Sequence, residues 1–156
     1  MISTRNLTEL PTIETLRKLT KSLAMLDAIL MPVWDNRYYS FNSKWAENEQ
    51  MASMRNGQGD GWYCGFGLPG AFLKGFDHES EMSPWSMEIT KVWPGVLDAV
   101  SDTFKSFATE PAFSMEDTTF CMWRGIQDAQ WNAGKISFPA GVLPQLEMEK
   151  SVLPLI

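Results

Sequence analysis

Ligands for a transition metal and partners for a disulfide framework are scarce in this chain. Its 156 residues include one histidine, His78, and two cysteines, Cys64 and Cys121. Zinc sites usually combine several histidine and cysteine ligands, and disulfide-stabilised domains carry more cysteines than this. The sequence therefore predicts no metal site and no disulfide scaffold. It favours two buried free thiols in strand-like aromatic surroundings, with a disulfide or a reactive thiol as the alternative.

Long apolar runs and dense basic clusters are also missing. No stretch approaches the roughly 18 apolar residues that a membrane-spanning helix needs, and the first residues lack the basic-then-apolar pattern of a secretion signal. The formal net charge is -6, and the one basic cluster is Arg17, Lys18 and Lys21. Binding to nucleic-acid phosphates requires clustered Lys and Arg over a larger surface. We therefore expect a cytoplasmic protein with no membrane anchor and no nucleic-acid partner.

Aromatic residues and methionine are abundant instead, with 7 Trp, 9 Phe, 3 Tyr and 10 Met. Aromatic side chains bury large areas, so a chain of this size can build one sizeable core. The methionines either fill that core or form an adaptable binding surface. We expect a single α+β domain over residues 1–156, with a polar leader at 1–11 and an irregular tail at 139–156.

The clearest periodicity lies between Thr12 and Pro32. Apolar residues recur at steps of three and four, which is typical of an amphipathic helix: Ile13, Leu16, Leu19, Leu23, Leu26 and Leu30. Thr12 can cap the start of this helix, and Pro32 is expected to end it.

The stretch GFGLPG at residues 65–70 has the G-x-G-x-x-G spacing of a dinucleotide-binding turn. Such a turn follows a strand and opens a helix whose N-terminus holds the pyrophosphate. The next residues, AFLKGFDH, are aromatic and interrupted by Gly75, which indicates another strand. Pro69 also lacks the N–H that a phosphate cradle would use. We therefore predict a hairpin with Pro69 and Gly70 as the central pair of a type II turn, and no cofactor.

Short aromatic segments bounded by Gly, Pro and Asn predict the remaining elements. Strands are expected at residues 39–45 (with one aromatic face), 51–56, 62–64, 71–78, 118–124 and 130–138. A second amphipathic helix is expected over residues 94–111, with an apolar stripe that includes Phe104 and Phe107. This order predicts an α+β fold, a mostly antiparallel sheet of about six strands with two amphipathic helices packed on one side.

Candidates for acid–base chemistry lie in the segment DHESE at residues 77–81. His78 is flanked by Asp77 and Glu79, and a histidine beside carboxylates can act as a general base. The alternatives are an oxygen-rich Mg²⁺ site and a solvated polar loop. The earlier loop NGQGDG superficially suggests a calcium site, but it offers one carboxylate, Asp60, and no closing glutamate.

Large aromatic and arginine side chains form a second candidate set on the predicted strands. Because alternate strand residues point to opposite faces, some of these side chains should face solvent. Trp, Tyr and Arg dominate interface hot spots. The predicted recognition residues are Arg37, Trp45, Arg55, Trp62, Trp123, Arg124 and Trp131. The alternatives are that they pack under the helices or cover the sheet, or that they line a small-ligand pocket.

Residues 22–66, with YYSFNSKW and MASMRNG, and residues 111–125, with MEDTTFC, resemble a family of small bacterial domains of unknown function. The resemblance covers about residues 16–138. It implies a bacterial protein and carries no activity. Acidic single-domain bacterial proteins of this kind include immunity and antitoxin-like proteins, which is an association of type.

We therefore expect a non-enzymatic interaction domain, of the immunity or antitoxin-like kind, whose partner is another protein. The first alternative is a small-molecule-binding or hydrolytic domain with its site near His78. The second is a structural subunit that assembles with copies of itself.

Overall fold

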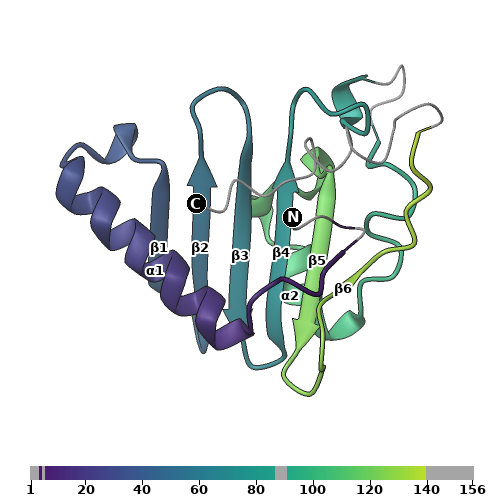
Figure 1. Cartoon of the computed structure of the whole chain (residues 1–156), viewed down its shortest axis with the longest axis horizontal. Coiled ribbons are helices and arrows are strands. Elements are labelled where there is room, and N and C mark those ends of the chain that lie inside the picture. The colour runs from purple at the N-terminus through teal and green to yellow at the C-terminus, as the bar shows by residue number, and fades with distance from the viewer. Residues whose placement is uncertain (1–3, 5, 87–90, 140–156) are drawn as a thin grey trace.

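A six-stranded antiparallel sheet organises the chain, in the strand order β1-β2-β3-β4-β5-β6 (Figure 1). The structure is a computed structural model that describes residues 4, 6–86 and 91–139. Its strands are β1 Tyr39–Ala46, β2 Glu49–Arg55, β3 Gly61–Gly67, β4 Gly70–Phe76, β5 Phe120–Gly125 and β6 Asn132–Ala133. The predicted α+β class and the antiparallel sheet are confirmed.

The long helix α1, Ile13–Leu30, crosses one face of this sheet (Figure 1). It begins as predicted, because the Thr12 side chain accepts a hydrogen bond from the Thr15 backbone N–H at 3.2 Å. Leu16 is buried in a core that also contains Trp62, Leu73 and Trp131. We call this side of the sheet the α1 face.

The opposite side, which we call the aromatic face, is covered by irregular chain. Phe104 and Phe107 pack there against Phe72 of β4, and Phe113 stacks on Phe107. These residues come from the short helix α2, Lys105–Ala108, and from three-residue 3-10 helices that include η3, Asp102–Phe104, and η4, Pro111–Phe113.

The expectation of two amphipathic helices on one side of the sheet is therefore wrong for the second helix. Residues 94–111 do not form one helix, and α2 lies on the face opposite α1. Gly95 has a φ of +90°, a conformation that does not continue a helix. The Ser101 side chain then accepts a hydrogen bond from Thr103 N, so it starts a new short helix instead of lying inside a long one.

The GFGLPG stretch forms the predicted β3–β4 hairpin, and β4 follows it in place of a helix. The predicted turn is wrong by one residue, because Gly67 pairs with Gly70 and leaves Leu68 and Pro69 as the connection. Gly70 has a φ of +140°, and a Cβ at this position would collide with the Arg124 carbonyl oxygen. This glycine therefore allows β5 to approach closely.

Strand β1 differs from its predicted single aromatic face. Its register shifts between Asn42 and Ala46. Tyr39 and Phe41 consequently pack on the α1 face, whereas Trp45 stacks on Phe113 on the aromatic face. A bulge of this kind changes which side chains share a face, and alternation alone does not reveal it.

Both ends of the chain depart from the expected pattern. Leu10, in the predicted polar leader, is buried in the core of the α1 face, and Trp131 Nε1 donates to the Pro11 carbonyl oxygen at 2.8 Å. The predicted strand at 130–138 shortens to the two residues of β6. Of the predicted tail, only residue 139 lies within the described residues.

The two cysteines are free and buried, as the sequence predicts. Cys64 belongs to the core of the α1 face and Cys121 to that of the aromatic face. Among the described residues, no helix is both long enough and apolar enough to cross a membrane.

Candidate functional site

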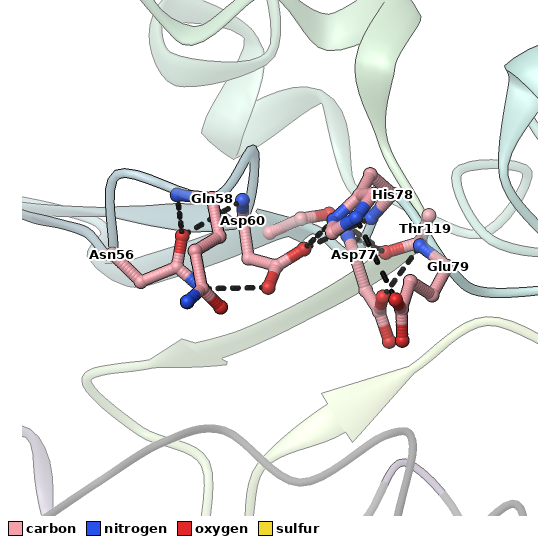
Figure 2. A network of polar contacts seen from close by, with 8 residues as sticks. Asn56, Gln58, Asp60, Asp77, His78, Glu79 and Thr119 are labelled. Atoms are coloured by element: carbon pink, nitrogen blue, oxygen red, sulfur yellow. Dashed lines mark hydrogen bonds and ion pairs between the residues drawn. The ribbon is translucent and has the colours of Figure 1, made fainter.

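A polar network joins the β2–β3 loop to the residues that follow β4 (Figure 2). Gly61 pairs with Phe76 at this end of the sheet. Asp60, just before β3, and His78, just after β4, are therefore brought together by the register of one hairpin. Asp77, His78 and Glu79 are the predicted candidates, whereas Asp60 is a partner that the sequence pattern does not predict.

Asp60 holds His78 through two contacts to the same carboxylate oxygen. Asp60 Oδ1 lies 2.6 Å from His78 Nδ1 and accepts a hydrogen bond from the His78 backbone N–H at 3.0 Å. Asp60 Oδ2 accepts from Asn56 Nδ2 at 2.6 Å. Glu79 is more remote, with its Oε1 at 3.9 Å from His78 Nε2. The imidazole is thus oriented by Asp60.

The protonation states in this network favour an ion pair. The hydrogen bond to Asp60 raises the pKa of the His78 imidazole. Burial raises the pKa of Asp60, but hydrogen bonds from His78 and Asn56 lower it by more, so this pKa lies below its usual value. Burial raises the pKa of Asp77. These shifts favour a charged His78–Asp60 pair, which stabilises the loop.

Asp60, Asp77 and His78 could hold a divalent cation, because their ligand atoms all lie within 4.8 Å of one another. Two carboxylates and one imidazole are chemically suitable ligands. However, Asp60 Oδ1 and His78 Nδ1 already contact each other directly. A bound cation would have to replace that contact.

Lys74 is a buried cation that the sequence analysis did not single out. It lies 2% exposed on β4, and its Nζ donates to the carbonyl oxygens of Ser114 at 2.9 Å and Asp117 at 3.2 Å. Burial lowers the pKa of Lys74 to about 8, against the attraction of nearby carboxylates. The sequence does carry a signal for a buried lysine at this position, because Lys74 lies within the apolar run AFLKGF.

Lys74 lines an open cleft of about 410 Å³, together with Asp60, Tyr63 and Asp117. Its ammonium group is directed at two backbone carbonyls of the covering chain, one of which belongs to Ser114 in a left-handed conformation with a φ of +44°. Through these two hydrogen bonds, Lys74 holds the turn at Ser114 against the sheet. The thiols do not supply a nucleophile, because burial raises the pKa of both Cys64 and Cys121.

Three of the predicted recognition residues lie in the core. Trp62, Trp123 and Trp131 are 2%, 6% and 4% exposed. These three follow the alternative stated for the set, packing under the covering chain, because both faces of the sheet are covered. Trp45 is half-buried against Phe113.

The three predicted arginines donate to backbone carbonyls. Arg37 holds Met31 and Pro32 just after α1, and Arg124 holds Asp128 and Ala129 after β5. Arg55 donates to the carbonyls of Trp34, Asp35 and Arg37. These side chains fix the shape of surface segments.

Eight exposed apolar side chains are concentrated where α1 ends and in the segment that follows it. We define the α1-end surface by its exposed members: Met25, Leu26, Ile29, Leu30, Met31, Val33, Trp34 and Tyr38. Ile29 and Leu30 are 74% and 71% exposed. The second half of α1 extends past β1, the last strand on that side of the sheet (Figure 1). The apolar periodicity predicts Leu26 and Leu30 on the stripe that α1 buries, and it does not predict this surface.

Comparisons with known proteins add no relative. No protein-family model matches the chain, and neither the curated proteins nor the solved structures contain a match. The resemblance to a bacterial domain family therefore stays a prediction, and the functional argument depends on the surfaces described above.

Proposed function

We propose that the chain is a non-enzymatic protein-interaction domain whose partner docks on the α1-end surface. The observation that carries this proposal is the exposure of eight large apolar side chains within residues 25–38. Single exposed apolar residues are common on soluble domains, but a cluster of this size is typical of an interaction site.

The surface is held in shape before any partner arrives. Arg55 places its guanidinium 4.5 Å from the centre of the Trp34 ring and also donates to the Trp34 carbonyl. Asp27 of α1 accepts a hydrogen bond from the Tyr39 backbone N–H at 2.7 Å. A preorganised aromatic anchor lowers the ordering cost of binding. Trp34, Tyr38 and Arg55 are also of the types found in interface hot spots.

The immunity or antitoxin-like role and the cytoplasmic location belong to the same proposal. The net charge of -6 over the whole chain favours a partner whose own net charge is positive. Two buried free thiols are compatible with a reducing compartment. The alternative of a hydrolytic site near His78 is less well supported, because the raised pKa of His78 favours its protonated form, which cannot act as a base, and both thiols are buried.

The test compares two single variants with two matched controls. Ile29→Glu and Trp34→Ala alter the α1-end surface, whereas Leu68→Glu and Ile126→Glu alter apolar residues of similar exposure, 73% and 65%, on the two turns at the ends of β3 and β5. The immobilised parent captures partners from the native lysate, and affinity is then measured for the captured protein.

We expect both α1-end variants to weaken binding at least about tenfold, which corresponds to roughly 1.4 kcal/mol. The two controls should bind like the parent, and circular dichroism should show all four folded. Equal binding by all four variants would show that the partner does not dock on the α1-end surface.

A further inference from the structure

Strand β1 forms one edge of the sheet, since it pairs with β2 alone among the described residues. The Arg55 N–H donates to the Tyr38 carbonyl at 2.9 Å, and the register continues through Tyr39 opposite Met54. In antiparallel pairing the backbone groups of successive residues point alternately toward and away from the partner. Tyr39 and Phe41 therefore direct their backbone N–H and C=O away from β2.

One of these outward groups is already used. The Tyr39 N–H donates to the Asp27 carboxylate, which ties α1 to the start of the edge. The Tyr39 carbonyl and both polar groups of Phe41 remain directed outward. This is the pattern that an additional antiparallel or parallel strand can complete.

A groove of about 280 Å³ follows this edge between α1 and β1. Its lining includes the small side chains of Ala24 and Ala28 from α1, together with Met25, Trp34, Tyr39 and Phe41. Alternate residues of a strand project to one face, so every second side chain of an added strand would point into this groove. Those residues should be apolar.

The charge along the groove is mostly positive. Among the described residues, its charged lining groups are Lys21 and Arg37. One carboxylate, that of Asp27, reaches the start of the edge, where it accepts the hydrogen bond from the Tyr39 N–H. Lys44 lies further along β1, exposed, and the described residues provide neither Lys21 nor Lys44 with an ion-pair partner. Lysines on an edge strand oppose pairing in general, and they oppose basic strands most strongly, so an acidic strand is the one that they select. In a chain of net charge -6 this edge is a local exception.

We propose that an extended segment of a partner protein, alternating apolar and acidic residues, adds to the sheet alongside β1 with its apolar side chains in the groove below α1. This inference rests on the proposed function and specifies how the partner binds. Main-chain hydrogen bonds to Tyr39 and Phe41 would provide affinity, and the groove and the lysines would provide selection.

The test uses synthetic peptides as probes. The first is an eight-residue peptide of alternating valine and glutamate with blocked ends, and the second replaces each glutamate by lysine. Two further versions of the acidic peptide carry N-methyl groups on either every valine or every glutamate. Binding is followed by NMR, which also reports protection of the Phe41 amide from exchange with solvent.

We expect the acidic peptide to bind at least about tenfold more tightly than the lysine peptide. A strand directs alternate N–H groups to its neighbour, so one N-methylated version should lose binding and the other should keep it. Absence of binding by the acidic peptide, or equal binding by the two N-methylated versions, would overturn the proposal.

Protein variants test the groove and its charge separately. Ala28→Leu fills the groove with a residue that helices accept, and it should abolish binding. Lys21→Glu with Lys44→Glu should weaken binding at least about tenfold, whereas Lys105→Glu with Lys135→Glu, exposed cations elsewhere, should leave it unchanged. Equal weakening by the two charge-reversed pairs would overturn the proposal.

Two outcomes distinguish this inference from the proposed function. If Ile29→Glu weakens capture of the natural partner but no peptide binds, the interaction surface stands and strand addition is wrong. If light scattering shows dimers that Ala28→Leu abolishes, a second copy of the chain occupies the edge and the proposal of a foreign segment is wrong.

Discussion

The two faces of the sheet are covered in different ways. One regular helix covers the α1 face, with residues such as Leu16 in the core and Ile29 in solvent. The aromatic face is covered by short irregular pieces that deliver Phe104, Phe107 and Phe113. The helix α1 extends beyond the sheet and leaves apolar side chains exposed. The short segments on the aromatic face bury their phenylalanines, and Lys74 holds the covering chain through hydrogen bonds to two backbone carbonyls.

The largest expected effect is on the aromatic face. Phe107 is 1% exposed, packs on Phe72 and lies over Gly65, which has no side chain to displace it. Phe107→Ala should lower the free energy of unfolding by about 3–5 kcal/mol, as measured by urea denaturation. Ile29→Ala on α1 is the contrast, and it should cost less than about 0.5 kcal/mol. Similar losses for the two variants would contradict the difference between the faces.

The second prediction concerns the fastening of the aromatic face by Lys74. The pKa of Lys74 falls from 10.5 to about 8 on folding, so between these values the unfolded chain binds more protons than the folded one. Stability from this group should therefore rise with pH across that window, by up to about 3 kcal/mol.

The measurement is urea denaturation at pH 7.5 and at pH 10, with Lys74→Met as the control. Methionine keeps an unbranched apolar side chain at the position and removes the titrating amine. The parent should gain stability over the variant as the pH rises. A constant difference between the two proteins would show that the pKa of Lys74 is not lowered by folding.

The smallest effect is expected at the start of α1. Thr12→Ala removes the oxygen that accepts from the Thr15 N–H, and it should cost about 1 kcal/mol. Thr12→Ser keeps that oxygen and should restore most of the loss, as judged from thermal unfolding. If serine and alanine are equally destabilising, the cap does not contribute.

Local signals in the sequence predict α1 and the β3–β4 hairpin well. Thr12, the apolar steps of three and four and Pro32 place α1 correctly, and the glycines of GFGLPG place a hairpin. Features that depend on contacts between residues far apart in the sequence are not predicted by such local signals. The register shift in β1, which turns Trp45 to the aromatic face, is decided by pairing with β2 and by stacking on Phe113.

The candidate sites divide in the same way. Asp60 could have been paired with His78 from the β3–β4 register alone, since both residues flank one hairpin. The exposure of Ile29 and Trp34 could not have been predicted from the sequence, because it depends on how far α1 extends past the sheet. Similarly, Arg37 and Arg55 look like recognition groups in the sequence, but their donors are directed at backbone carbonyls.

The placement of Cys64 and Cys121 in separate cores gives the chain two internal chemical sensors. A thiol reagent reaches Cys64 only when the packing beneath α1 opens, and it reaches Cys121 only when the chain over Phe72 lifts away. The sheet between them prevents the two sulfurs from joining while the fold is intact. The rate at which each thiol reacts therefore reports the local opening of one face of the sheet, independently of the other face.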